Sequence, residues 1–274
     1  MTDSLPARPT WSRLGRYRHS LWLLTVRDLR VRYSTSALGY FWSILDPLVM
    51  ASIYWFVFVQ VFGRAVGEEP YIVFLLAALL PWTWFTGTVS DCTRAFLREA
   101  KLIRSTKIPR TIWVARLVLS KGIEFIASLP VLVIFGIVTG ATLHWQAVFA
   151  VFTGATVGIG VLWVFLAIAL QAALLVGIGL IVAPLVVFFR DLERAVKLTL
   201  RFLFYASPII YSLEDLPEGM QFWASFNPLA GIFSLYRAAF FPSQLDWFAV
   251  GVGSAVIAVL LLIGLLVFRG AERA

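Results

Sequence analysis

Two carboxylates lie inside otherwise apolar stretches of the sequence, where they could relay protons or bind cations within a membrane. Asp46 precedes Pro47 near the start of one stretch, and Glu124 lies within another. A charge at membrane depth is costly, so we expect each side chain to face protein or water. A proton-driven carrier usually has more ionisable groups inside its spans, so these two acids alone do not predict a proton pathway.

Signatures of soluble catalysis are missing from the sequence. It contains no G-x-x-x-x-G-K-[ST] phosphate-binding loop, no H-E-x-x-H zinc motif and no G-x-S-x-G nucleophile elbow. Cys92 is the one cysteine, so no disulfide can form within the chain, and the two histidines lie far apart. We therefore expect no catalytic residue, no metal site and no cofactor bound by this chain.

The composition requires lipid as part of the solvent. Hydrophobic residues make up 60% of the chain and charged residues 14%, against about 25% charged residues in soluble domains. We predict an all-α polytopic membrane protein with a transmembrane domain over 37–268. The length accommodates about six to eight spans of about 20 residues with their loops. We place six, at 38–62, 71–93, 112–138, 147–189, 198–213 and 247–268.

The apolar stretch 147–189 is longer than a simple span. As one helix it would be about 64 Å long, against a hydrocarbon core of about 30 Å. It could hold two spans, or one long, bent helix with interfacial extensions. The basic residues after position 189 should lie inside while the preceding turn lies outside, so the number of crossings is odd and we expect one long span.

The charge distribution predicts the orientation of the chain. The net charge is +8, and with these spans every cation except Arg64 and Arg237 falls on the side of the two termini. Cytoplasmic loops of membrane proteins carry an excess of Lys and Arg. We therefore expect both termini in the cytoplasm, and the same asymmetry explains the basic charge without a nucleic-acid partner.

Residues 1–36 read as a cytoplasmic tail followed by an amphipathic helix from about residue 20. The helix has an apolar face with basic flanks, formed by Trp22, Tyr33, Arg27, Arg30 and Arg32 among others. Such a helix lies in the headgroup layer of the membrane, with its arginines toward anionic lipid or a partner. The alternative is an ordinary juxtamembrane segment that follows the charge rule.

Two further segments are neither spans nor simple turns. Residues 94–111 form a basic, amphipathic loop. Residues 214–246 mix acids with short apolar pieces that are broken at Pro217, Pro228 and Pro242. We expect short helices in a re-entrant or interfacial region there, because irregular backbone is tolerated at membrane depth only where protein or water covers it.

The order and spacing of several motifs resemble one family of transporters. The motifs are RDLRVRYSTSALGYFWSILDPL, LLPWTWF, LREAKLIRSTKIPR, FFRDLERAV, SPIIY and NPLAGIFSLYRAAF. Together they are similar to the permease subunit of ABC-2 type exporters, in the branch that exports O-antigen, teichoic acids and other lipid-linked polysaccharides. The resemblance covers about residues 25–268 of the chain.

This resemblance implies a non-enzymatic subunit of an ATP-driven exporter in the bacterial plasma membrane. Such permeases form homodimers and work with two copies of an ABC ATPase, which bind ATP and Mg²⁺. The implied substrate is a polysaccharide on a polyprenyl diphosphate, moved from the cytoplasmic to the outer side. Arginine far outnumbers lysine, which suggests a GC-rich genome, and the chain resembles mycobacterial galactan-export permeases in particular.

The resemblance also implies roles for individual segments. The loop 94–111 would carry a coupling helix that docks in a groove of the ATPase, with Arg98, Glu99, Lys101 and Arg104 as contacts. The N-terminal amphipathic helix would flank the ATPase and gate the lateral entry of substrate. Residues 214–246 would form a pair of re-entrant helices at an external gate.

Within this external gate the candidate residues are Asn227, Tyr236 and Arg237. Arg237 is stranded among acids on the outer side. It could pair with Glu218, with Asp246 or with a substrate phosphate.

Aromatic side chains crowd the first expected span, at Phe41, Trp42, Tyr54, Trp55 and Phe58. Tryptophan and tyrosine commonly anchor a protein at the membrane interface, but so many aromatic residues in one span need another explanation. Aromatic faces stack on sugar rings, so these residues are candidates for the lining of a glycan path.

Two other classes of protein are alternatives. An integral-membrane glycosyl- or acyltransferase would need clustered acids around a diphosphate–Mg²⁺ site, and the sequence shows no such cluster. A secondary transporter commonly shows inverted repeats with polar breaks at the midplane, and no corresponding halves are visible. A neighbouring gene for an ATPase with a phosphate-binding loop would favour the exporter.

Overall fold

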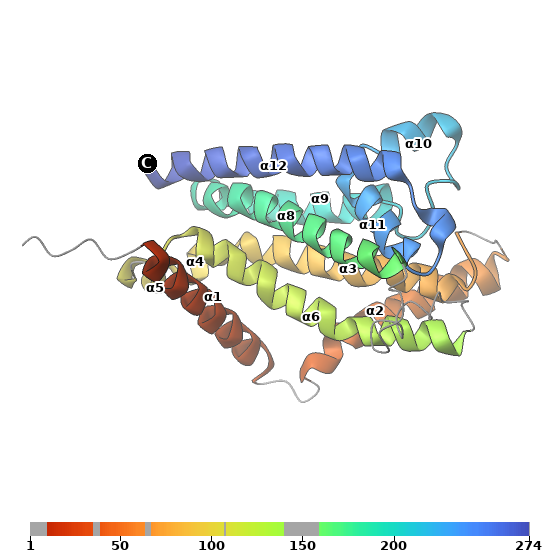
Figure 1. Ribbon diagram of the computed structural model, residues 1–274, viewed down its shortest axis with the longest axis horizontal. Coiled ribbons are helices and arrows are strands. Elements are labelled where there is room, and N and C mark those ends of the chain that lie inside the picture. The colour runs from red at the N-terminus through yellow and green to blue at the C-terminus, as the bar shows by residue number, and fades with distance from the viewer. Residues whose placement is uncertain (1–9, 35–38, 64–66, 107, 140–158, 274) are drawn as a thin grey trace, which may run out of the picture.

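All regular structure in the described part of the chain is helical (Figure 1). The computed structural model describes residues 10–34, 39–63, 67–106, 108–139 and 159–273. The longer helices are α1 Thr10–Tyr33, α2 Trp42–Trp55, α3 Tyr71–Cys92, α6 Thr111–Val138, α8 Ile159–Phe188, α9 Leu192–Ala206 and α12 Trp247–Arg273. The shorter helices are α4 Ala95–Arg98, α5 Ala100–Ser105, α10 Glu218–Ala224 and α11 Pro228–Ala238, with η1 Gly39–Phe41, η2 Phe56–Val61 and η3 Pro242–Gln244.

Helices long and apolar enough to cross a membrane occur at five places in the described residues. They are Trp42–Val61, Tyr71–Cys92, Thr111–Val138, Leu162–Phe188 and Trp247–Ala271. In the first of them, α2 continues as the π-helix η2. The prediction of an all-helical polytopic membrane protein is thus confirmed. The beginning of the expected fourth span, 147–158, and the tail 1–9 lie outside the described residues.

The helix expected over 198–213 differs from α9. It begins earlier, at Leu192, and has 15 residues, a length of about 22 Å that falls short of a hydrocarbon core of about 30 Å. It ends where Ser207 takes extended backbone, with φ −100° and ψ 148°, because residues before a proline, here Pro208, avoid the helical region. The described residues therefore do not contain the sixth complete span.

α1 begins at Thr10, earlier than expected, and packs along α6. Thr25 and Leu29 are buried, whereas Trp22 is 57% exposed. The apolar face expected from the sequence is thus divided between the protein and its surroundings. The side chain of Tyr33 lies outside the described residues.

α3 forms the centre of the bundle because it is apolar over most of its circumference, with polar residues along one side at Thr83, Thr86 and Ser90. Most of its side chains are buried, and it contacts α2, α6, α8, α9 and α11 (Figure 1). A helix of this kind is stable only where neighbours cover its apolar faces.

α2 has the opposite character, because many of its apolar side chains are exposed, among them those of Trp42 and Ile53. The side chain of Phe56, which directly follows α2, is exposed as well. Lipid or another chain must cover that surface.

α8 and α12 touch backbone to backbone at two glycines. A Cβ atom on Gly264 would lie 2.6 Å from the Gly177 carbonyl oxygen, and one on Gly177 would lie 3.0 Å from the Leu261 nitrogen. α11 meets α12 in the same way, because a Cβ atom on Gly231 would lie 2.5 Å from the Ala249 carbonyl oxygen. Small residues allow membrane helices to approach this closely, so α8, α11 and α12 form one tightly packed group.

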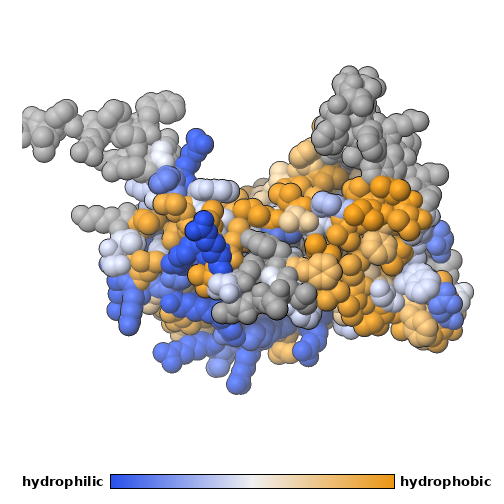
Figure 2. Space-filling model, turned by 90° about the horizontal axis from the view of Figure 1, so that it is seen from below, coloured by the Kyte–Doolittle hydropathy of each residue, from blue (hydrophilic) through white to orange (hydrophobic). Residues whose placement is uncertain are grey.

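Hydrophilic side chains gather at one end of the molecule, and hydrophobic ones dominate the rest of the same face (Figure 2). We call this end, which comprises α1, α4, α5 and the adjoining ends of α6, α8 and α12, the basic end. The C-terminus lies there as well, whereas α10 and α11 lie toward the opposite end (Figure 1).

The α8–α12 contact gives a test of this packing. Gly264→Leu should lower the melting temperature of the purified protein in detergent, because over-packing a close contact costs about 1–3 kcal/mol or more. Gly251→Leu is the matched control, since nothing lies within 4 Å of a Cβ atom at that position of the same helix. Equal melting temperatures for the two variants would contradict the backbone-to-backbone contact.

Candidate functional site

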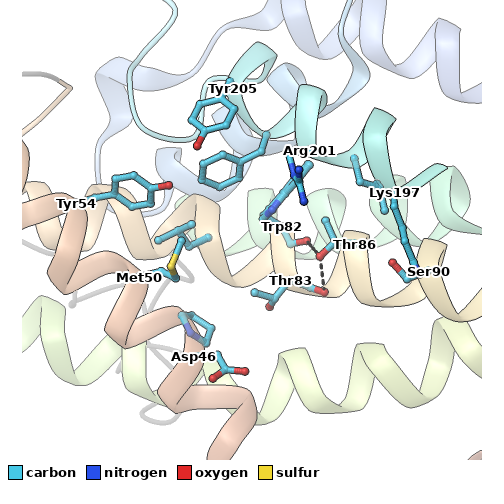
Figure 3. A pocket seen from close by; sticks show the side chains of 14 residues that line it. Asp46, Met50, Tyr54, Trp82, Thr83, Thr86, Ser90, Lys197, Arg201 and Tyr205 are labelled. Carbon is cyan, nitrogen blue, oxygen red and sulfur yellow. Dashed lines mark hydrogen bonds between the residues drawn. The ribbon is translucent and has the colours of Figure 1, made fainter. Parts of the chain in front are cut away.

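A cavity of about 440 Å³ lies between α2, α3 and α9 (Figure 3). Each helix contributes polar groups: Asp46 from α2, Thr83 and Thr86 from α3, and Lys197 and Arg201 from α9. Figure 3 shows Lys197 and Arg201 reaching from α9 toward α3. Asp46 and Arg201 are exposed, and neither forms an ion pair or a hydrogen bond through its side chain with another described residue.

The hydroxyl groups on α3 are oriented so that they can accept hydrogen bonds from a ligand. Thr83 Oγ1 donates to the Leu80 carbonyl oxygen at 2.7 Å, and Thr86 Oγ1 donates to the Trp82 carbonyl oxygen at 3.0 Å. Since each hydroxyl proton is used within the helix, the lone pairs of the oxygen are left for a ligand. The α3 wall of the cavity therefore accepts hydrogen bonds, while the cations of the α9 wall donate them.

Aromatic rings form the rest of the lining. Tyr54 stacks on Phe204, with ring centroids 5.9 Å apart and an interplanar angle of 27°. Phe204 also contacts Trp82 at 5.6 Å and Tyr205 at 5.1 Å between centroids. A largely apolar pocket with a few convergent polar groups is the usual form of a ligand site. This one suits a ligand that carries negative charge, hydroxyl groups and an apolar face.

Only part of the aromatic path expected from the sequence reaches this cavity. Tyr54 lines it, and Phe58 lies beside Tyr54 with ring centroids 6.4 Å apart. Phe41, Trp42 and Trp55 are exposed and do not line the cavity. Of the adjacent pair Tyr54 and Trp55, only Tyr54 lines the cavity, and Trp55 is exposed on α2.

Ion pairs at the basic end connect α1 to α6 and to the segment of α4 and α5. Arg27 Nη2 lies 2.5 Å from Glu99 Oε1. Arg116 Nη1 lies 2.7 Å from Asp28 Oδ1, and its Nη2 lies 3.5 Å from Glu99 Oε1. The Arg116 side chain is 4% exposed, so its charge depends on these acids. Burial raises the pKa of the Asp28 carboxyl, against the opposing effect of Arg116 and then Arg27.

A second set of ion pairs connects α1 to α3 and α6. Arg32 lies 2.7 Å from Asp91 and 3.0 Å from Glu124, which also pairs with Lys121 at 2.8 Å. Glu124 thus faces protein, as expected. Arg27 and Arg32, expected to point toward lipid or a partner, pair instead with acids of their own chain, because those acids are buried or half-buried in the protein and need cations.

The residues expected to contact an ATPase fall into two groups. Arg98, Lys101 and Arg104 are exposed on α4 and α5 and form no ion pair with a described residue. Glu99 differs from this expectation, because it is bound to Arg27 on α1 and to Arg116 on α6. The segment therefore presents cations outward and its acid inward.

A separate network joins the start of α4 to α9. Arg94 Nε donates to Glu193 Oε1 at 2.9 Å, and Lys197 Nζ lies 2.8 Å from the same oxygen. The hydrogen bonds from Arg94 and then from Lys197 lower the pKa of Glu193 to about 2. Because Lys197 also lines the cavity, the network leads from the α3–α4 junction to the candidate site.

The outer candidate Arg237 has an unexpected environment. Its side chain is 2% exposed in a helix that packs against α12, α8 and α3. The guanidinium donates to the Ile209 carbonyl oxygen at 2.7 Å and to that of Tyr211 at 3.3 Å, and lies 3.6 Å from the centroid of Phe74. The guanidinium pairs with neither Glu218 nor Asp246, two of the partners that the sequence allowed, because the turn after α9 leaves carbonyl groups without helical partners and these bind it.

The other two gate candidates also hold α11 in place. Asn227 caps the helix, since its Oδ1 accepts from the Leu229 nitrogen at 3.0 Å while its Nδ2 donates to Ser207 Oγ at 2.8 Å. Tyr236 is 3% exposed and meets Phe125 edge to face, with centroids 5.6 Å apart. The contacts of Asn227 and Tyr236 are structural ones within the protein.

The sequence profile of ABC-2 type transporters matches residues 19–241, which include the cavity, the ion pairs of the basic end and α11. The chain belongs to this family. The O-antigen export system permease protein RfbA of Klebsiella pneumoniae is 33% identical over 259 residues, which are 93% of each chain. RfbA of Myxococcus xanthus is 26% identical over 252 residues, 91% of this chain and 90% of its own. The polysialic acid transport protein KpsM of Escherichia coli is 26% identical over 261 residues, 92% of this chain and 93% of its own.

Sequence reasoning missed two features of this ABC-2 protein. The charge rule treats Lys197 and Arg201 only as cations of the inner side, although their spacing of four residues places them on one helical face. Asp28 and Arg116 pair across 88 residues of sequence, and no local pattern could reveal that contact.

The ion pairs at the basic end can be tested by a double-mutant cycle on the ABC-2 protein. Arg27→Gln and Glu99→Gln should each lower the melting temperature in detergent, Glu99→Gln more so, because it also deprives buried Arg116 of an acid. The loss of unfolding free energy in the double variant should be smaller than the sum of the two single losses, by about 0.5–3 kcal/mol. Arg30→Gln, on the exposed side of α1, is the control and should be neutral. Strictly additive losses would mean that Arg27 and Glu99 do not interact.

Proposed function

We propose that this chain is the membrane subunit of an ATP-driven exporter that moves a polysaccharide on a polyprenyl diphosphate from the cytoplasmic to the outer side of the plasma membrane. The observation that carries the proposal is the match over 93% of both chains to a protein named as an O-antigen export permease. Its role is transport, and ATP and Mg²⁺ bind to a partner subunit.

The cavity between α2, α3 and α9 supports a glycan substrate. Its aromatic rings offer apolar faces to sugars, its hydroxyl groups accept hydrogen bonds from sugar hydroxyls, and its cations suit a phosphate. Among lipid-linked polysaccharides, cell-wall galactan is the cargo to test first. The excess of arginine over lysine is typical of GC-rich genomes, and the chain resembles mycobacterial galactan-export permeases.

The basic end supports a cytoplasmic ATPase partner. Under the positive-inside rule this end faces the cytoplasm, and both chain termini then do as well. Arg98, Lys101 and Arg104 form an exposed cationic surface on the short helices α4 and α5. A groove with acidic residues on an ABC ATPase would be its complement, and two ATPase copies would serve two copies of this chain.

A second copy of the chain would complete the cavity. Its rim is exposed at Met50 and Tyr205, and the neighbouring Leu198 and Phe202 on α9 are 65% and 70% exposed. In a homodimer this apolar surface and the exposed side of α2 would pack against the partner, so that two cavities line one path.

Co-purification tests the exporter. The chain tagged at its C-terminus and extracted in mild detergent should carry an ABC ATPase, identified by mass spectrometry. Reversing Arg98, Lys101 and Arg104 to Glu should reduce that ATPase by at least about ten-fold, because like charges at an interface cost several kcal/mol. Reversing Arg190 and Arg194, exposed cations outside α4 and α5, should leave it bound. A chain that exports glycan with no ATPase partner would favour a secondary transporter instead.

The aromatic lining gives a second test. Tyr54→Leu should slow glycan export by about 2- to 10-fold, the loss expected for one aromatic contact, with the ATPase still bound. Phe165→Leu, at an exposed aromatic residue of α8 outside the cavity, should export normally. Export would be followed as glycan reaching the outer membrane surface, and equal rates for the two variants would count against the cavity as the path.

A further inference from the structure

Arg201 is a cation at membrane depth without a partner in the described part of the protein. It lines the cavity together with Trp82 from the middle of α3, and it lies about 14 Å along α9 from Leu192. Its side chain is exposed and forms no ion pair or hydrogen bond with another described residue. Among the described residues, Lys197, one turn earlier on the same face, bonds Glu193 alone, so two of its three donors have no partner there.

The other buried or half-buried arginines already have partners for their terminal nitrogens, although the Nε atoms of Arg116 and Arg237 have none among the described residues. Arg237 is bound to backbone carbonyl oxygens. Arg27, Arg32 and Arg116 line a larger cavity of about 600 Å³ at the basic end, but each of them pairs with acids of the chain. An unpaired charge at depth is costly unless water or a ligand reaches it. The α9 wall is therefore the place where an anion from outside the protein would gain most.

The opposite walls of the cavity restrict what that anion can be. Thr83 and Thr86 have lone pairs to offer, and the Asp46 carboxylate accepts hydrogen bonds and repels negative charge. A bare inorganic anion could use the α9 wall alone. A phosphate ester that also carries sugar hydroxyls could use both walls, with its phosphate near α9 and its hydroxyls near α2 and α3.

We infer that Arg201, with Lys197, binds the phosphate of a lipid-linked glycan, and that Thr83, Thr86 and Asp46 bind hydroxyl groups of its first sugar. This rests on the proposed function, because it takes the exported molecule as the ligand. The planar guanidinium suits two phosphate oxygens at once, whereas lysine acts as a point charge. The site thereby orients the substrate, with the phosphate against α9 and the sugar chain against α3.

Binding to the purified permease, with its co-purifying partner in lipid nanodiscs, tests the site. The probes are undecaprenyl diphosphate, neutral undecaprenol and phosphatidylglycerol as a competitor, with affinities from native mass spectrometry. The diphosphate should bind Arg201→Gln about ten-fold more weakly than wild type, the loss expected for a hydrogen bond to a charged group. Arg201→Lys should recover only part of the affinity, because the ammonium keeps the charge but not the geometry that binds two phosphate oxygens. Arg194→Gln, an exposed cation of α9 outside the cavity, should bind as wild type does.

Three results would overturn the inference: unchanged binding to Arg201→Gln, equal binding of undecaprenol, or equal competition by phosphatidylglycerol, which would assign the site to bulk lipid. Glycan export measured on the same variants separates the two proposals. Normal export by Arg201→Gln with unchanged binding removes the site and leaves the exporter. Arg201-dependent binding by a chain that exports no glycan upholds the phosphate site and removes the exporter.

Discussion

Every charge that this chain carries to membrane depth has to be neutralised by another group or reached by water, and the arrangement of its helices follows from the ways in which this is done. Glu124 is neutralised by Arg32 on α1. Arg237 binds the carbonyl groups freed where α9 ends. Asp46 and Arg201 stay unpaired and open into a cavity. The first two arrangements hold the fold together, and the third leaves charge for a ligand.

These networks also divide the molecule into parts that differ in rigidity. α8, α11 and α12 meet at glycines with backbone in contact, and α3 is buried except along the side that lines the cavity. α2 and α9 are covered on one side only. The segment of α4 and α5 reaches α1 and α6 through Glu99, and the residue before α4, Arg94, reaches α9. A displacement at the basic end would therefore act on the helices around the cavity more readily than on the packed group.

The sequence predicts the apolar helices well because their length and composition depend on local residues alone. It also contains the signal that ends α9, since Ser207 precedes Pro208, but the hydropathy of the following residues conceals that signal. The pairing of Arg27 with Glu99 and of Asp28 with Arg116 depends on how distant helices pack. For the same reason, aromatic crowding in the first span points to Tyr54 without separating it from Trp55, which faces away from the cavity.

The ion pairs of α1 have a consequence for biogenesis. Ribosomes make the chain from its N-terminus, so α1 reaches the membrane surface before α6 is synthesised. Arg32 is then already in place when Glu124 emerges, and Asp28 when Arg116 does. Insertion of α6 would otherwise bring these charges to the membrane with fewer partners, Lys121 for Glu124 and Glu99 for Arg116. The N-terminal helix can thus act as a chaperone within the chain. A variant that lacks α1 would depend more on the cell's insertion machinery to place α6.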